Sequence, residues 1–178
     1  LPEKLSPYGD VTDDKGKFPE ATVVLVRSKT KVTREYIDSA PNLKLVIRGG
    51  VGLDNIDLNY AAEKGIAVHN TAAASSIAVA ELAFTLMIAL PNHVTKADST
   101  MRAGQWAKKK LKRTELYKKI LGIVGLGRIG TELAKRATAF GMNVVAYDPF
   151  VDSSEVATMK PDLKDVLNNS DYVSLHLP

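Results

Sequence analysis

The sequence has 178 residues, of which 45% are hydrophobic and 25% charged, and its formal net charge is +4. These values are typical of an ordinary globular protein of one or two domains. The absence of cysteine excludes a disulfide framework and a thiolate metal site, and it favours a reducing compartment. No basic and apolar leader opens the chain, and the longest apolar stretch, residues 77–90, is shorter than the roughly 20 residues that a bilayer span needs. We therefore expect a cytoplasmic protein with no membrane contact, in which this stretch is a buried helix.

Short runs rich in β-branched residues recur along the chain and predict strands. They lie at residues 21–28, 43–49, 65–70, 120–125, 143–148 and 171–178. Helical patterns separate these runs, which is typical of parallel βαβ units. The sequence therefore predicts an α/β protein.

The helices between these strands have recognisable ends. Asp57 is placed to cap a helix that stops at Gly65, and Ser75 or Ser76 to cap the long apolar helix. Pro91 breaks or kinks that helix, and residues 95–104 continue in helical rhythm. We accordingly predict three parts, comprising a first domain over residues 1–92, a linking helix and basic linker over 93–118, and a second domain over 119–178.

The most basic segment is the run KKKLKRTELYKK at residues 108–119. Such a run attracts phosphates or nucleic acid in some proteins. The alternative is a solvated face beside a linker, which we favour because no aromatic interleaving accompanies the lysines. We expect no nucleic-acid partner, and salt-dependent DNA affinity would indicate otherwise.

Three glycines, Gly125, Gly127 and Gly130, form the sequence G-x-G-x-x-G between the strand at 120–125 and a helical pattern. This order is the one that a dinucleotide-binding fold requires. Gly125 permits a tight turn, Gly127 leaves room for a pyrophosphate, and Gly130 lets the helix pack closely on the strand. The pyrophosphate is then expected on the free N–H groups and positive dipole end of that helix.

Asp148 ends the next predicted strand, 23 residues beyond Gly125. A carboxylate at this point accepts hydrogen bonds from the adenosine ribose hydroxyls and repels a 2′-phosphate, so the pattern favours NAD over NADP. The alternative is that the glycines merely serve a strand-to-helix turn.

Several motifs together resemble those of the D-isomer-specific 2-hydroxyacid dehydrogenases. In chain order they are RGGVGLDNID at 48–57, GIAVHNT at 65–71, SSIAVAE at 75–81, GLGRIG at 125–130, YDP at 147–149 and LHLP at 175–178. The segments at 26–33 and 103–116 look most like the branch of the family that oxidises 3-phosphoglycerate in serine biosynthesis. The resemblance implies a Rossmann-type doubly wound parallel sheet that binds NAD, part of a flavodoxin-like substrate domain, and a homodimer.

The resemblance also implies substrate-binding residues. The backbone N–H groups of Val51 and Gly52 would hold the substrate carboxylate, and Arg27 and Arg48 would reach the phosphate. Ser75 would lie near the substrate and the nicotinamide. The alternatives are a plain turn for the glycine-rich loop, solvated surface arginines, and a helix cap for the serine.

On the cofactor side, the resemblance adds Val79, Arg128, Ile129, His176 and Pro178 to the glycines and Asp148. Departures from the family's usual residues occur at Ala72, Ser75 and Asn92 and bear on fine specificity.

The resemblance places the catalytic arginine, acid and histidine beyond Pro178, so the chain looks like a fragment. His69, His93 and His176 are poor candidates for the acid/base, and no pair of histidines has metal-ligand spacing, so we expect no metal. The rival hypothesis is a non-catalytic NAD-binding module of the same fold, as in corepressors.

Overall fold

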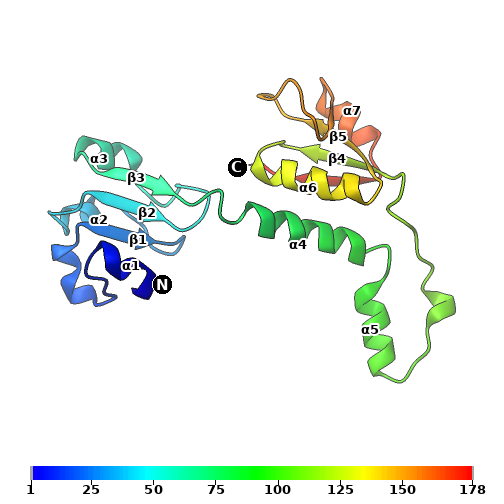
Figure 1. Cartoon of the computed structure of the whole chain (residues 1–178), viewed down its shortest axis with the longest axis horizontal. Coiled ribbons are helices and arrows are strands. Elements are labelled where there is room, and N and C mark those ends of the chain that lie inside the picture. The colour runs from blue at the N-terminus through cyan, green and yellow to red at the C-terminus, as the bar shows by residue number, and fades with distance from the viewer. Residues whose placement is uncertain (1, 178) are drawn as a thin grey trace. The chain divides into compact units, whose positions relative to one another are not determined.

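The computed structural model describes residues 2–177 and consists of two compact units, Leu1–Ala74 and Ser75–Pro178. Each unit is built on its own parallel sheet flanked by helices (Figure 1). The predicted α/β class with parallel strands is confirmed. The strands are shorter than the β-branched runs by one to four residues, because the ends of those runs turn into loops.

The first unit contains a three-stranded sheet of order β1-β2-β3. Its elements are α1 (Pro2–Leu5), the 3₁₀ turns η1 (Ser6–Tyr8) and η2 (Lys15–Glu20), β1 (Val23–Val26), α2 (Arg34–Asp38), β2 (Leu45–Arg48), α3 (Leu58–Glu63) and β3 (Ala67–Asn70). The core lies on one face of the sheet, where Val24, Val26 and Val46 pack with Ile37 of α2 and Ala61 of α3. Since successive side chains of a strand point to opposite faces, the sheet's other face carries the half-exposed residues of β1.

The second unit contains a four-stranded parallel sheet of order β6-β5-β4-β7. Its elements are α4 (Ser76–Ala89), α5 (Val94–Arg102), the 3₁₀ turn η3 (Lys108–Lys110), β4 (Ile120–Val124), α6 (Arg128–Ala139), β5 (Asn143–Tyr147), β6 (Thr158–Met159), α7 (Leu163–Asn168) and β7 (Tyr172–Leu175). A Cβ added at Gly130 of α6 would meet Ile123, and one added at Gly122 would meet Val166 of α7. Neighbouring residues of β4 point to opposite faces, so α6 and α7 cover the two faces and the sheet is doubly wound.

The predicted helix ends are confirmed at three places. The Asp57 carboxylate accepts a hydrogen bond from Tyr60 N at 3.0 Å, Gly65 follows the end of α3 with φ 69°, and Pro91 lies in the break between α4 and α5. The expected serine cap of α4 is wrong, because Ser75 is the cap residue but has helical backbone angles and its side chain accepts no capping bond.

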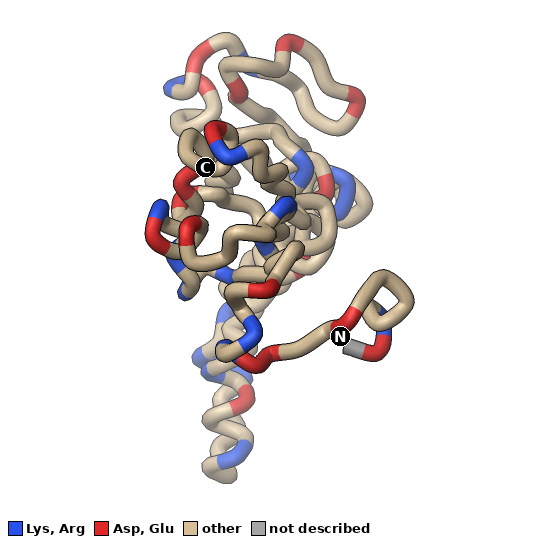
Figure 2. The backbone as a smooth tube through the Cα atoms, turned by 90° about the vertical axis from the view of Figure 1, so that its left-hand side faces the viewer, with Lys and Arg blue, Asp and Glu red and all other residues tan. Residues whose placement is uncertain are grey.

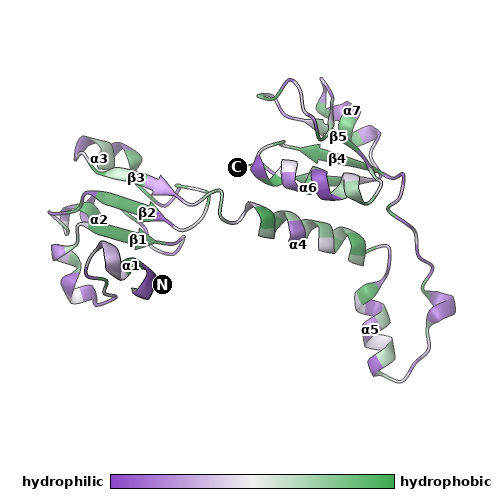
Figure 3. Cartoon of the chain, viewed as in Figure 1, coloured by the Kyte–Doolittle hydropathy of each residue, from purple (hydrophilic) through white to green (hydrophobic). Residues whose placement is uncertain are grey.

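Helix α4 is not the buried helix that its apolar sequence predicts. Ala80 and Phe84 are buried, whereas Ile77, Leu82 and Leu86 are 54 to 62% exposed. Only one face of the helix is packed, although most of its residues are apolar (Figure 3). Among the described residues no single helix is long and apolar enough to cross a bilayer, and α4 and α5 reach that length together only with a 65° bend between them.

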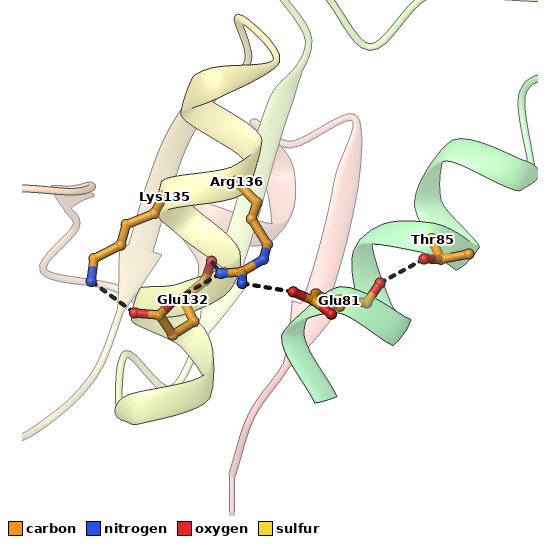
Figure 4. A network of polar contacts seen from close by, with 5 residues as sticks. All are labelled: Glu81, Thr85, Glu132, Lys135 and Arg136. Atoms are coloured by element: carbon orange, nitrogen blue, oxygen red, sulfur yellow. Dashed lines mark hydrogen bonds and ion pairs between the residues drawn. The ribbon is translucent and has the colours of Figure 1, made fainter. Parts of the chain in front are cut away.

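The packed face of α4 lies against α6. Arg136 of α6 bonds to Glu81 of α4 at 3.1 Å and to Glu132 at 2.8 Å (Figure 4). Hydrogen bonds from Lys135 and Arg136 lower the pKa of the Glu132 carboxyl. Helix α4 thus groups with the second unit. The predicted limit at residue 92 assigned this helix to the first domain, since the sequence alone does not reveal which element the helix packs on. The domain limits at 92 and 118 remain predictions.

Candidate functional site

The glycine loop lies at the topological switch point of the second sheet. Strand β4 is central, the chain moves outward through β5 and β6 on one side, and it returns to pair β7 on the other. Loops on opposite sides of such a point diverge and leave a crevice beyond the carboxyl ends of the strands. The loop after β4, the end of β5 at Asp148 and the end of β7 at His176 all lie at this edge.

The reason why a side chain is absent differs among the three glycines of the loop. Gly125 has φ 91°, and a Cβ there would lie 2.5 Å from the His176 carbonyl oxygen. A Cβ at Gly130 would collide with the Gly125 carbonyl, so this glycine allows the close approach of α6 to β4. Gly127 has φ −75°, which any residue adopts, and a Cβ there would meet no atom within 4 Å. Packing within the described chain therefore explains Gly125 and Gly130 but not Gly127, whose bare backbone suits a ligand that approaches closely.

The backbone donors of this loop divide into two groups. Gly125 N bonds to the Tyr147 carbonyl at 2.9 Å, and Leu126 N bonds to Asp148 Oδ2 at 2.8 Å. The first bond of α6 that closes a helical turn runs from Thr131 N to the Gly127 carbonyl. The N–H groups of residues 127–130 precede that bond, so they form the donor-rich helix start that suits a phosphate.

Asp148 lies directly after β5, where the sequence pattern predicted a ribose-binding acid. Its Oδ2 accepts from Leu126 N, and its Oδ1 accepts from Phe150 N at 2.9 Å. Each carboxylate oxygen has two lone pairs, so both can still accept a ribose hydroxyl. The bond to Leu126 adds a role that the sequence did not reveal, since it ties the glycine loop to the end of β5 across 22 residues.

His176 follows β7 and closes the other side of the loop. Its backbone N donates to the Val124 carbonyl at 2.8 Å, and its ring Nε2 lies 2.9 Å from Ser174 Oγ. Burial lowers the pKa of this imidazole, so the neutral form is favoured beside the loop. Pro178, the other cofactor residue predicted in this segment, lies outside the described residues.

The remaining cofactor candidates lie on helix starts of the second unit. Arg128 is exposed and Ile129 partly buried in the first turn of α6. Ser75 precedes α4, and Val79, one turn later, is 39% exposed. Their contact with cofactor or substrate remains a prediction.

The first unit brings Arg27 and Arg48 together at the carboxyl edge of its sheet. Arg48 ends β2 opposite Val26 of β1, and Arg27 directly follows Val26 in the chain. The Arg27 Cγ lies 3.8 Å from the position that a Cβ of Gly49 would take. Arg48 folds back on its own loop, with one Nη 2.6 Å from where a Gly50 Cβ would lie. Its Nε is buried without a hydrogen-bond partner among the described residues.

The loop after β2 exposes two further donors. Gly49 N bonds to the Val26 carbonyl and Gly50 N to Thr71 Oγ1, whereas Val51 and Gly52 are exposed and their N–H groups have no acceptor among residues 2–177. Consecutive free N–H groups of this kind form a concave anion site. The carboxylate-binding role predicted for Val51 and Gly52 is thus compatible with the backbone.

Comparison with known proteins places this geometry in a family. The family described as "D-isomer specific 2-hydroxyacid dehydrogenase, NAD binding domain" matches residues 84–178, a little more than half of the chain. The chain belongs to this family. The predicted family, the Rossmann-type fold and the NAD cofactor are confirmed by this match and by the solved structures below.

Curated relatives of these dehydrogenases match most of the chain. A hydroxypyruvate reductase of Thermotoga maritima is 49% identical over 161 residues, which are 90% of this chain and 53% of the relative. A D-3-phosphoglycerate dehydrogenase of Methanocaldococcus jannaschii is 46% identical over 166 residues, which are 91% of this chain and 32% of the relative. The chain therefore spans about half or less of the length of these relatives.

Two solved structures have a similar fold. The D-lactate dehydrogenase of Aquifex aeolicus, complexed with NAD and lactic acid, is 29% identical with a TM-score of 0.81 over 100% of this chain and 59% of that one. An acyclic imino acid reductase in complex with NADPH and D-Arg is 28% identical with a TM-score of 0.84 over 99% of this chain and 60% of that one. The fold therefore occurs with either cofactor, and the preference for NAD that the sequence pattern at Asp148 favours remains a prediction.

The three histidines do not form a dehydrogenase acid/base pair within the described residues. His69 is exposed on β3, and His93 Nε2 lies 2.8 Å from the Lys112 carbonyl oxygen. None of the three is hydrogen-bonded to a carboxylate in residues 2–177. The same part of the chain contains no cluster of three or more metal-ligating side chains, and the expectation of a metal-free protein remains a prediction.

The basic run forms an exposed connection between α5 and β4. Lysine and arginine positions gather beside α5 (Figure 2). Lys119, the last of the run, bonds to Asp171 at 3.1 Å. This exposure is compatible with the solvated face that we favoured, and the absence of a nucleic-acid partner remains a prediction.

Two hollows of the second unit lie away from the cofactor loop. One, of about 310 Å³, is lined mainly by apolar residues of α5 and residues 106–111, including Trp106, which is 77% exposed. The other, of about 600 Å³, lies where the ends of α4 and α6 meet residues 113–117. Neither hollow is lined by residues of the glycine loop, so the cofactor site predicted there rests on the chemistry of the loop and not on a cavity.

Proposed function

We propose that this chain supplies the NAD-binding half and part of the substrate site of an NAD-dependent D-2-hydroxyacid dehydrogenase. The observation that carries the proposal is Gly127. Neither its backbone angles nor its surroundings require glycine, yet it opens a helix whose first N–H groups face the end of the sheet. A pyrophosphate lying against this backbone explains why a side chain is absent there.

Different residues of the second unit bind different parts of the cofactor. The N–H groups of residues 127–130 bind the pyrophosphate, Asp148 accepts from the adenosine ribose, and His176 supports the loop from the side of β7. When bound, NAD supplies the nicotinamide ring that accepts a hydride from the alcohol carbon. The chain's own task is to orient that ring towards the substrate.

For the substrate we propose 3-phosphoglycerate, oxidised to 3-phosphohydroxypyruvate in serine biosynthesis. The N–H groups of Val51 and Gly52 bind the carboxylate, and Arg27 and Arg48 attract the phosphate. Two arginines at the same edge of the sheet support a dianionic group better than an uncharged one. The names of the relatives support three-carbon substrates, since they include hydroxypyruvate reductase and D-3-phosphoglycerate dehydrogenase.

We further propose a cytoplasmic homodimer that buries the exposed face of α4. Leu82, Leu86 and Leu90 are 60 to 72% exposed on consecutive turns, which is more contiguous apolar surface than a monomer usually leaves in water. Light scattering at micromolar concentration should give a dimer for the chain and a monomer for Leu86→Glu. Leu167→Glu on α7, where the leucine is 45% exposed, is the control and should stay dimeric. A monomeric wild-type chain would remove this part of the proposal.

The NAD proposal is tested by two glycine variants with opposite expectations. Gly127→Ala should leave the melting temperature unchanged and weaken NAD binding about tenfold or more, the effect of a steric overlap of about 1–3 kcal/mol. Gly104→Ala should lower the melting temperature, because φ is +70° there, and leave NAD affinity unchanged. Calorimetric titration of residues 1–178 with NAD measures the affinities, and wild-type affinity in Gly127→Ala would contradict the proposal.

A further inference from the structure

The loop after β2 is held by Asn70, which ends β3, and by Thr71, which follows it. The side-chain amide of Asn70 donates to the Val51 carbonyl at 2.6 Å. The backbone N–H of Thr71 is shared between the carbonyl oxygens of Arg48 and Gly50, each 3.2 Å away, and the Thr71 hydroxyl accepts from Gly50 N at 3.0 Å. Both loop carbonyls are therefore directed towards the end of β3.

Directing these carbonyls inward directs the neighbouring N–H groups outward. A trans peptide is planar, and its C=O and N–H point in opposite directions. The Gly50 carbonyl shares a plane with Val51 N–H, and the Val51 carbonyl shares a plane with Gly52 N–H. Because Thr71 holds the first plane and Asn70 the second, both N–H groups point away from β3. Neither of these two donors has an acceptor in residues 2–177.

The two planes are held by different kinds of group. The first is held by a backbone N–H, which every residue except proline supplies at position 71. The second is held by the Asn70 side chain, which is exposed and forms this bond across 19 residues. Gly50, with φ 142°, supplies the backbone freedom that the turn between them needs.

We propose that Asn70 is a positioning residue that sets the direction of the Gly52 N–H, so that Val51 and Gly52 present two parallel donors to the carboxylate of a 2-hydroxy acid. This inference rests on the proposed function, because it takes the loop to be the carboxylate site. It assigns to Asn70 a part in substrate binding without contact with the substrate. Two roughly parallel N–H donors match the two oxygens of a carboxylate, which a single donor does not.

The test uses the ¹⁵N-labelled chain, with glycolate as the smallest 2-hydroxy acid and glycolamide as its neutral analogue. In the wild type, glycolate should shift the amide resonances of both Val51 and Gly52. In Asn70→Leu, which is close in size but lacks the donor, the Gly52 shift should be lost, the Val51 shift should persist, and glycolate affinity should fall about tenfold. Glycolamide binding should change little. In Asn70→Gln, which keeps the donor, the Gly52 shift should return.

Thr71→Val is the matched control, because it removes the hydroxyl that accepts from Gly50 N but leaves the backbone N–H of residue 71 bonded to the Gly50 carbonyl. Both amides should still shift. If the Gly52 amide responds in Asn70→Leu as it does in the wild type, the inference is wrong. Absence of a glycolate response at Val51 and Gly52 in the wild type also overturns it. NAD added to the same samples reports separately through the amides of residues 127–130, so failure of cofactor binding is distinguished from failure of the carboxylate loop.

Discussion

Removal of the Asp148 carboxylate should destabilise the glycine loop and lower the affinity for NAD. The carboxylate accepts from Leu126 N at 2.8 Å and from Phe150 N at 2.9 Å. Leu126 is only 6% exposed, so Asp148→Ala leaves a buried N–H without its acceptor. An unsatisfied buried donor costs about 1–3 kcal/mol, and the melting temperature of the second unit should fall accordingly.

The effect on cofactor binding is of similar size. Hydrogen bonds to a charged group contribute about 1.5–3 kcal/mol, and each 1.4 kcal/mol is a factor of ten in affinity. Calorimetric titration should therefore give NAD affinity about 10- to 100-fold weaker in Asp148→Ala. Asp148→Asn keeps an oxygen acceptor and most of the stability, but it removes the repulsion of a 2′-phosphate, so the preference for NAD over NADP should narrow.

Asp152→Ala provides a matched control for charge. Asp152 is exposed, four residues further along the chain, and forms no hydrogen bond or ion pair with residues 2–177. This variant removes the same charge without disturbing the loop, so its stability and NAD affinity should equal those of the wild type. If Asp148→Ala binds NAD within threefold of Asp152→Ala, the role assigned to the carboxylate is refuted.

Three further outcomes are expected. Leu133→Ala should destabilise the second unit by about 2–5 kcal/mol in denaturant unfolding, because Leu133 is fully buried in the core of that unit. A loss below 1 kcal/mol would contradict this and would mean that neighbouring side chains fill the cavity. In the complete enzyme, Arg48→Ala should raise the KM for 3-phosphoglycerate more than for its unphosphorylated analogue, and equal changes would indicate a structural arginine. Because burial lowers the pKa of His176 in the folded state, the unfolded state binds more protons below pH 6.5, so stability should fall on acidification through that range; a His176→Gln variant with the same acid dependence would contradict this.

The sequence by itself determined those features whose chemistry is local. Positive φ at Gly65 and Gly125 and the capping of α3 by Asp57 depend on groups within a few residues of each other. The order of strand, glycine loop, helix and acid was sufficient to predict that the loop and Asp148 share the carboxyl edge of the second sheet. The remaining candidate site residues were predicted only from the family motifs, because composition and periodicity gave no signal at those residues.

Other elements had weak sequence signals and were not predicted. Helix α7 has six residues and β6 has two, which is too short for a hydrophobic period to emerge. The long apolar α4 had the opposite difficulty. Because most of its residues are apolar, its sequence did not indicate which face would pack on α6 and which would stay exposed.

Only the tertiary structure decided the contacts that orient the two candidate sites. Asp148 reaches Leu126 because β5 pairs in parallel with β4, which brings their carboxyl ends to one edge. Asn70 reaches Val51 for the same reason, through the pairing of β3 with β2. Each bond joins a side chain to a backbone group about 20 residues away, and a backbone group has no residue identity that a sequence can display. Which N–H groups are taken and which remain free for a ligand is therefore set by strand order and register, after the chain has folded.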